Sequence, residues 1–433
     1  MATEQPGSLL RKFEAAAAVV VVLMMSNALI GPLLDPKQTG GETIPLLRQI
    51  WLPIYGVIFA LAALRFRDLG RTWLPVLLLS ILLAWTFASV MWSIDPEVTT
   101  RRAFAVTMTT LFGVYLAASF GGRGMSEVLA TSFLILALGS YLVCLAFPAM
   151  GVHHDVNVGL WRGLWYEKNQ MGGMMVYGVL ASVSAAITSP RRRALWIVTL
   201  LLCAGLVVMT HSATALISLL IVLGGAAALI VMGMGAAAAV AAAWAGVTAA
   251  LALAGVYYLA PQLVFQVLGK DASLTGRTQI WTQILRDSEK QPFTGYGYAA
   301  FWGHESPPAK WIRAQLQWPV PTAHNGWLDL LIQLGQIGVG IFIVLFGLAV
   351  AAAVIRHRKL RDGYFAALFL AVYSVSLQSE SVILTQNGLP WVLAVAAMVR
   401  LLTPGPASVS KSRPKVAAKP AVRHIPPEIT VHA

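Results

Sequence analysis

The stretch ALWIVTLLLCAGLVVMTHSATALISLLIVLGGAAALIVM, residues 194–232, decides the fold class. It holds two apolar runs, 194–210 and 213–232, which are separated by only His211 and Ser212. Each run has about the 20 residues that a helix needs to cross roughly 30 Å of hydrocarbon. The stretch therefore predicts two membrane-spanning helices joined by a very short turn.

Similar runs recur along the chain, and 58% of its 433 residues are apolar whereas 11% are charged. This composition excludes a soluble enzyme, a secreted disulfide scaffold, a fibrous protein and a disordered chain. The sequence predicts an all-α, polytopic integral membrane protein with about twelve transmembrane helices. We expect these helices near 13–34, 48–64, 72–92, 103–120, 126–147, 170–188, 194–210, 213–232, 234–259, 326–354, 363–380 and 384–402.

Charge predicts the orientation of these helices, because Lys and Arg accumulate in short cytoplasmic loops. Basic clusters such as Arg191–Arg193 fall in alternate loops if the N-terminus is cytoplasmic. Residues 260–325 then form a large periplasmic loop within a polytopic domain, 1–402, and 403–433 form a disordered basic cytoplasmic tail near anionic lipids. The net charge of +13 lies on the cytoplasmic face, so no nucleic-acid partner is expected. A signal peptide is the alternative for the first helix, but that segment lacks an obvious small-residue cleavage site.

Several motifs of energy-coupled or metal-dependent enzymes are missing. The chain has no GxxxxGK[ST] loop, no HExxH and no DxD pair, and both cysteines, Cys144 and Cys203, lie within apolar runs. We therefore expect no disulfide, no metal site and no cofactor. A reaction on a substrate that was activated elsewhere remains open, and it would need cations, a base and a surface for the rest of the substrate.

Residues 275–302, TGRTQIWTQILRDSEKQPFTGYGYAAFW, supply the first candidates on the outer face. Thr275 can cap a short interfacial helix that Pro292 ends, and the spacing puts Ile280, Trp281, Ile284 and Leu285 on its apolar face. Arg277 would hold a phosphate, or else extend to lipid headgroups. Trp281 and Tyr296 would stack on sugar rings, or else belong to the aromatic belt of a membrane protein.

Other candidates lie where the chain enters the membrane. His324 can accept a proton if it is neutral, with Asn325 and Glu380 orienting it, or else it is an interfacial or capping residue. Glu380 is expected at the outer end of a span, where a carboxylate needs a partner or a wet cavity. Arg162, Lys168 and Asn169, in RGLWYEKNQMG, would contact the same phosphates, or else anchor a helix end.

Taken in order, WSIDPE, RGLWYEKNQMG, SATAL, LTGRTQIW, GYGYAAFW and AHNGWLDLLIQLGQIG resemble the O-antigen ligase and polymerase superfamily of bacterial envelope glycosyltransferases, and above all its ExoQ-type exopolysaccharide polymerases. The resemblance, over about 85–345, implies an inner-membrane protein with a periplasmic active site, which acts on an undecaprenyl-diphosphate-linked oligosaccharide beside a flippase and a chain-length regulator. It implies catalytic roles for Arg277 and His324. Ala213 stands where ligase members often have an arginine, and this departure weakens the ligase interpretation.

The resulting hypothesis is a metal-independent polymerase that transfers a glycan chain to the hydroxyl of a lipid-linked repeat unit. A ligase would use the same donor but a lipid A core or another acceptor. A transporter would show inverted repeats and broken helices with polar groups near the midplane. A non-catalytic assembly protein would not need Arg277 or His324.

Overall fold

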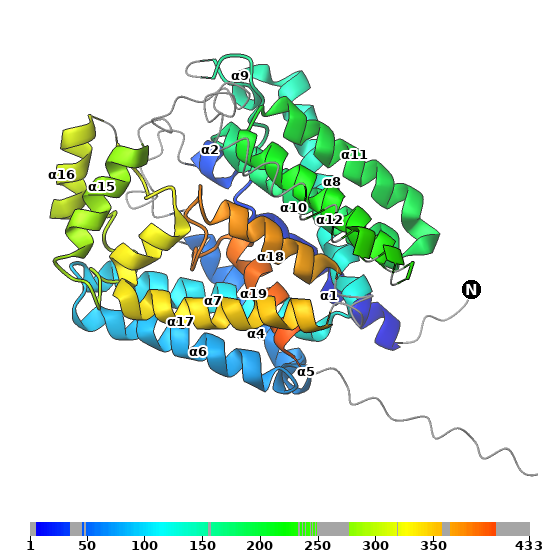
Figure 1. Ribbon diagram of the computed structural model, residues 1–433, viewed down its shortest axis with the longest axis horizontal. Coiled ribbons are helices and arrows are strands. Elements are labelled where there is room, and N and C mark those ends of the chain that lie inside the picture. Colours follow the sequence, from blue (N-terminus) through cyan, green and yellow to red (C-terminus); the bar gives the residue numbers. More distant parts are fainter. Residues whose placement is uncertain are drawn as a thin grey trace, which may run out of the picture. The chain divides into compact units, whose positions relative to one another are not determined.

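The computed structural model describes residues 6–34, 49–154, 157–232, 277–317, 319–356 and 364–403, with isolated positions at 46 and between 234 and 248. Within these residues every regular element is a helix, and the one β feature is a bridge between Val152 and Trp161. The predicted all-α class is therefore confirmed for the described part of the chain (Figure 1).

The described helices match most of the predicted spans. Seven of them are long and apolar enough to cross a membrane, and three shorter apolar helices accompany them. The seven correspond to Trp73–Met91, Pro96–Ser119, Gly122–Ala146, Lys168–Thr188, Pro190–Met209, Ala213–Met232 and Gly326–Ile355. The predicted span 234–259, residues 260–276 of the predicted periplasmic loop and the tail after Thr403 lie largely or wholly outside the described residues.

The helices keep one set of labels below. Their bounds are α1 Pro6–Met25, α2 Ile30–Leu34, α4 Trp51–Leu64, α5 Phe66–Gly70, α6 Trp73–Ala88, α7 Pro96–Ser119, α8 Gly122–Ala146, α9 Pro148–Gly151, α10 Lys168–Thr188, α11 Arg193–Met209, α12 Ala213–Met232, α15 Arg277–Ser288, α16 Pro307–Leu316, α17 Gly326–Arg356, α18 Tyr364–Ser376 and α19 Leu389–Leu402.

The helices pack in two groups. Helix α10 packs against α8, α11 and α12, while α19 packs against α7 and α17 (Figure 1). Helix α18 joins the groups, since it contacts both α12 and α19. A small residue permits the closest approach, because a Cβ on Gly113 of α7 would lie 2.7 Å from the Cβ of Val395 on α19.

Helix α17 is interrupted at Gly335, whereas the sequence predicted one continuous span. Gly335 has φ +64° and ψ −171°, a conformation that is essentially restricted to glycine. A Cβ at this position would lie 2.2 Å from the carbonyl carbon of Phe293. The backbone of a distant segment, 292–299, therefore lies directly against the break.

This segment binds the backbone groups that the break releases. The hydrogen bonds run from Tyr296 N to Ile332 O (3.0 Å), from Gly297 N to Gln333 O (3.0 Å), from Gln336 N to Pro292 O (2.8 Å) and from Ile337 N to Phe293 O (3.4 Å). Since an unpaired backbone group is costly within a membrane protein, these bonds make the break tolerable. They also fix the segment 292–299 to α17.

The last two predicted spans are shorter than expected. Helix α18 ends at Ser376 and α19 begins at Leu389, so residues 377–388 form a polar loop. Tyr55 Oη donates a hydrogen bond to Asn387 Oδ1 (2.9 Å), and Asn387 N donates one to Thr109 Oγ1 (2.9 Å). Glu380 accordingly lies in this loop rather than on a helix.

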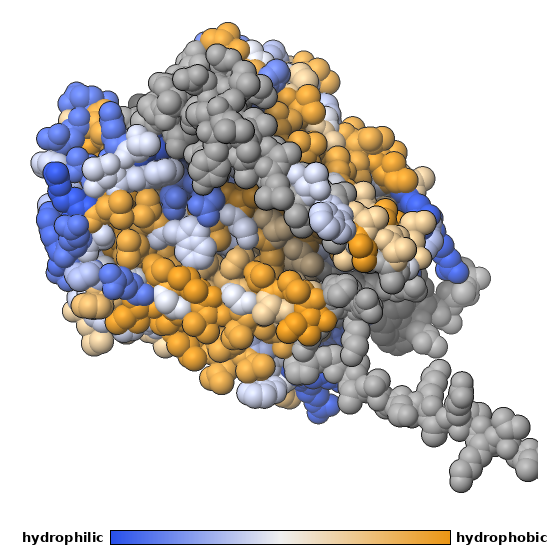
Figure 2. All heavy atoms as spheres, in the orientation of Figure 1, coloured by the Kyte–Doolittle hydropathy of each residue, from blue (hydrophilic) through white to orange (hydrophobic). Residues whose placement is uncertain are grey.

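Residues 277–317 form a small lobe with its own apolar core, and Figure 2 shows hydrophilic residues gathered over α15 and α16 but hydrophobic residues along α6 and α17. The core contains Ile280, Ile284, Phe301 and Ile312 of the lobe, and residues of the chain that follows, Val320, Ala323 and Ile332, complete it. The predicted apolar face of α15 is confirmed for the two isoleucines and wrong for Leu285, whose exposed fraction is 49%. We call residues 277–317 the α15–α16 lobe.

Candidate active site

A cavity of about 890 Å³ lies among α4, α7, α10, α12 and the loop 377–388. Most of its lining area is apolar, but two guanidinium groups, one imidazole and one carboxylate contribute to it, from Arg101, Arg102, His324 and Glu380. A large apolar cavity with a few convergent polar groups is the usual form of a small-molecule or lipid site.

His324 occupies the tight turn that leads into α17. Its backbone is left-handed, with φ +49°, a conformation that a non-glycine residue adopts only when its surroundings hold it. Trp281 Nε1 donates a hydrogen bond to the carbonyl of Ala323 (2.9 Å), and Gly326 N donates one to Leu377 O (2.8 Å). The turn is thus fixed on both sides of His324, and its imidazole lines the cavity.

Asn325 caps α17. Its Oδ1 accepts hydrogen bonds from the backbone N–H groups of Trp327 (3.0 Å) and Leu328 (3.1 Å), which are otherwise unpaired at a helix start. Its Nδ2 donates to Gln378 O (3.5 Å). Asn325 therefore positions the backbone next to His324, and a direct contact between Asn325 and the imidazole stays a prediction.

Burial, and secondly the nearby positive charge of Arg277, lower the pKa of His324 to about 4. Both causes disfavour the imidazolium ion. At neutral pH the ring is consequently uncharged and has one nitrogen with a lone pair, as a proton acceptor requires.

Arg277, the first residue of α15, faces Glu380. Arg277 Nη2 lies 3.9 Å from Glu380 Oε1, at the outer limit of an ion pair, and the exposed fractions of the two side chains are 15% and 37%. The structure therefore brings Arg277, His324 and Glu380 into one neighbourhood, although the three residues come from separate segments of the sequence.

Two arginines that were not predicted as site residues also reach the cavity. Arg101 and Arg102 lie in the second turn of α7, which Asp95 caps by accepting a hydrogen bond from Val98 N (3.0 Å). Arg102 Nη1 donates to Ala299 O (3.0 Å), while Arg101 Nη1 lies 3.8 Å from Glu97 Oε1. An Asp-Pro pair is a helix-start signal, so WSIDPEVTTRR contained the information that places these arginines on a helix.

The predicted group of outer cations is only partly assembled. Arg162 Nε donates to Met150 O (2.9 Å), which ties the guanidinium to the end of α9. Lys168 begins α10, and its backbone N donates to His153 Nε2 (3.3 Å). Among the described residues, Asn169 rather than Arg162 or Lys168 lines the cavity. Phosphate contacts by Arg162 and Lys168 stay predictions.

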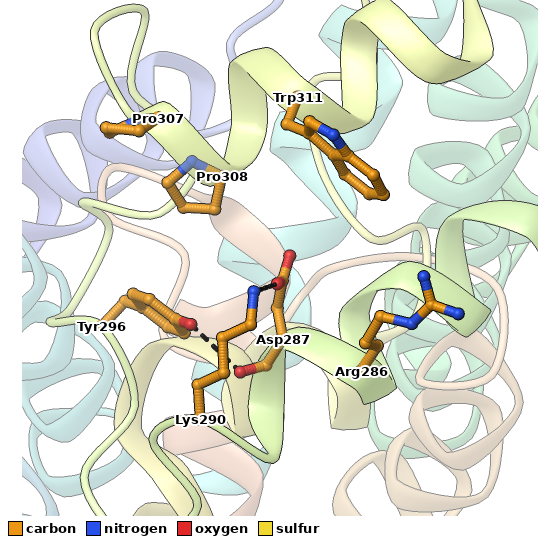
Figure 3. Close-up of a pocket in the computed structure, with 7 residues that line it drawn as sticks. All are labelled: Arg286, Asp287, Lys290, Tyr296, Pro307, Pro308 and Trp311. Atoms are coloured by element: carbon orange, nitrogen blue, oxygen red, sulfur yellow. Dashed lines mark hydrogen bonds and ion pairs between the residues drawn. The ribbon is translucent and has the colours of Figure 1, made fainter.

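Tyr296 lines a different, smaller pocket in the α15–α16 lobe, whose volume is about 440 Å³ (Figure 3). Its hydroxyl donates to the carbonyl of Asp287 (3.1 Å), so the ring lies beside the end of α15. Trp281, by contrast, supports the His324 turn. The two aromatic residues that were predicted to bind sugar thus have separate positions.

The described residues contain no group of three or more His, Cys, Asp or Glu side chains that could hold a metal ion.

Comparisons with known proteins show which sequences this chain is similar to. Residues 198–343 match a family model described as O-antigen ligase. The resemblance to that family is confirmed. The matched range includes Arg277 and His324 as well as most of α11, all of α12 and the first half of α17.

A relative with a described role supports the same family. The chain is 23% identical over 306 residues to the exopolysaccharide production protein ExoQ of Rhizobium meliloti, an alignment that covers 66% of this chain and 67% of the relative. The apolar helices indicate a multi-pass membrane protein, and the matches show that the chain is similar to proteins of O-antigen ligation and exopolysaccharide production.

Proposed function

We propose that the protein is an exopolysaccharide polymerase of the bacterial inner membrane. It transfers a glycan chain from an undecaprenyl-diphosphate donor to the hydroxyl of a second lipid-linked repeat unit on the periplasmic face. The observation that carries this proposal is the convergence of Glu380 and a neutral His324 at one largely apolar cavity, with Arg277 next to Glu380 at its edge. The family match and the name of the relative support it.

Arg277 binds the diphosphate of the donor. The 3.9 Å separation from Glu380 leaves the guanidinium able to turn toward a more highly charged anion, which offers short, charge-assisted hydrogen bonds. Arg101 supplies a second positive charge at another wall of the cavity. It is better placed for this role than Arg162, because the Arg162 guanidinium already binds the carbonyl of Met150.

His324 takes a proton from the acceptor hydroxyl. The acceptor oxygen forms a bond to the anomeric carbon while the bond from that carbon to the phosphate oxygen breaks, and undecaprenyl diphosphate leaves as an anion. Arg277 stabilises the charge that grows on this leaving group. The bound diphosphate also raises the pKa of His324 above its value of about 4, which makes the imidazole a stronger base when the donor is present.

Glu380 and Trp281 have positioning roles. Glu380 lies close enough to Arg277 to direct the guanidinium, and Trp281 holds the turn that carries His324. Precise placement of both substrates supplies much of the rate in such a transfer, because no group on the enzyme forms a covalent intermediate.

A ligase is the main alternative, and it differs only in the acceptor. A transporter is less well supported. Although α17 is broken, as in many transporters, the freed backbone groups of α17 bind residues 292–297 instead of facing a cavity.

The proposal is tested by polysaccharide production in cells that lack the native gene. His324→Ala and Arg277→Ala should abolish polymer at normal protein levels, whereas His304→Ala and Lys310→Ala, which alter exposed residues of the α15–α16 lobe, should leave it unchanged. Full-length polymer from both His324→Ala and Arg277→Ala would refute the catalytic roles and favour a non-catalytic assembly protein.

A further inference from the structure

The smaller pocket of the α15–α16 lobe has the composition of a binding site. It is lined by Arg286, Asp287, Lys290, Tyr296, Pro307, Pro308 and Trp311, which come from the end of α15, the following turn and the start of α16. None of these residues lines the large cavity. The pocket is therefore separate from the proposed catalytic site.

Asp287 is the unusual member of this set. Its side chain is 6% exposed, and Oδ1 accepts a hydrogen bond from Lys290 Nζ (2.6 Å). Oδ2 is buried and has no hydrogen-bond partner among the described residues. A buried carboxylate at the negative end of a helix is unfavourable, so its unpaired oxygen requires an explanation.

The direction of the Asp287 carboxylate suggests an explanation for this unpaired oxygen. Figure 3 shows the carboxylate of Asp287 pointing into the space between Pro308 and Trp311, with Arg286 to one side and Tyr296 to the other. Trp311 is 44% exposed, so one face of its indole is available. An oxygen acceptor beside an exposed indole fits a ligand that has both hydroxyl donors and an apolar C–H face.

A pyranose ring has both features. The C–H face of the ring would stack on Trp311, one hydroxyl would donate to Asp287 Oδ2, and Arg286 would donate to a ring substituent. A phosphate or an anionic headgroup fits less well, because it could bind Arg286 but its oxygens are acceptors and supply no donor for Asp287 Oδ2. The ion pair between Asp287 and Lys290 satisfies Asp287 Oδ1, but it leaves Asp287 Oδ2 without a hydrogen bond.

We propose that this pocket binds a sugar residue of the glycan at a distance from the reacting bond. Asp287 lies ten residues after Arg277 on α15, which is about 15 Å at the helical rise of about 1.5 Å per residue. A glycan whose diphosphate end is at Arg277 would reach the pocket with a sugar several residues away. That the ligand is the substrate glycan rests on the proposed function.

The site would retain the growing chain between rounds of transfer. Loss of the pocket should therefore shorten the polymer while leaving single transfer intact. This outcome differs from loss of His324, which should stop transfer itself.

The experiment measures binding and polymer length on the same full-length proteins in lipid nanodiscs. The probe is the repeat-unit oligosaccharide released by mild acid from its lipid-linked precursor, and saturation-transfer NMR reports its binding. Trp311→Ala should bind it about fivefold more weakly than the wild-type protein does, as expected for loss of an aromatic contact. Asp287→Asn should also bind it more weakly, because a hydrogen bond to an amide is weaker than one to a carboxylate. Trp311→Phe should retain most of the affinity, and Leu285→Ala, which removes an exposed side chain of α15 outside the pocket, should retain all of it.

The two proposals fail in different ways. His324→Ala should bind the oligosaccharide normally but make no polymer. Polymer from His324→Ala would refute the proposed function, yet the binding data would still decide the role of the pocket. Equal affinity in Trp311→Ala and Leu285→Ala, or binding of glycerol 1-phosphate in place of the oligosaccharide, would overturn the sugar site.

Discussion

Replacement of Gly335 by alanine tests the break in α17, on which the placement of the segment 292–299 depends. Gly335→Ala places a Cβ 2.2 Å from the carbonyl carbon of Phe293, whereas the same change at Gly340 meets no atom within 4 Å. Both glycines belong to α17, so they form a matched pair. We expect a large loss of stability from the first variant alone.

The magnitude follows from two contributions. A non-glycine residue in the conformation of Gly335 costs about 1–3 kcal/mol. Displacement of the segment 292–297 would also weaken the hydrogen bonds that cross the break, each of which contributes about 1 kcal/mol. The free energy of unfolding should therefore fall by about 3–6 kcal/mol for Gly335→Ala. Gly340→Ala should be neutral or stabilising by up to about 1 kcal/mol, because alanine favours a helix.

Thermal unfolding in detergent measures the difference. The midpoint for Gly335→Ala should lie roughly 5–10 °C below that for Gly340→Ala, given the usual relation between free energy and Tm for large chains. Polymer production should fall in parallel, since the segment 292–299 also binds Arg102 through Ala299 O. Equal midpoints for the two variants would refute the described break and its backbone contacts.

Four further predictions concern the pKa of His324, the pH dependence of stability, helix capping and topology. Arg277→Gln removes one of the two causes that lower the pKa of His324. The acid limb of the residual transfer rate of this variant should therefore move to higher pH. An acid limb at the same pH as in the wild-type protein would contradict the interaction between Arg277 and His324. The pKa of His324 is about 4 in the folded protein, which is below the ordinary value of 6.5. The neutral form of His324 therefore stabilises the folded protein above pH 6.5. This contribution, up to about 3 kcal/mol, is lost as the pH falls toward 4. Thermal unfolding of His324→Ala should therefore depend less on pH in that window than unfolding of the wild-type protein. Asn325→Ala should cost about 1–2 kcal/mol, and Asn325→Asp, which keeps an acceptor at the cap, should cost less; equal losses would exclude the capping role. Lys310→Cys should react with a membrane-impermeant maleimide in spheroplasts, because the Lys310 side chain is 53% exposed. The native cysteines, Cys144 and Cys203, are buried and should not react. Reaction only after lysis would place the α15–α16 lobe in the cytosol.

The helices themselves could be predicted because each apolar run is long enough to stand out from its polar neighbours. The break at Gly335 could not be predicted from the sequence. The motif LGQIG has the composition of an ordinary membrane helix, and the segment that compensates for the break is distant in sequence. For the same reason the loop 377–388 was assigned largely to helices.

The site was predicted in part. Arg277 and His324 were chosen from their charge, chemistry and position, and the resemblance then implied their catalytic roles. The structure places Arg277 beside Glu380, and His324 and Glu380 line the same cavity. Arg101 was overlooked because its segment was assigned to a loop, although Asp95 and Pro96 begin a helix there. The hydrogen bond of Arg162 to Met150 depends on a local chain reversal at α9 that hydrophobic periodicity does not reveal.

The most direct test of the central claim is a reconstituted reaction with purified protein and a radiolabelled, undecaprenyl-diphosphate-linked repeat unit as the only substrate. The account predicts a ladder of lipid-linked products that lengthens with time, is absent with His324→Ala and is retained with His304→Ala. A label that remains in single repeat units until a lipid A core is added would instead show a ligase. The same ladder from His324→Ala would contradict the chemistry assigned to the cavity.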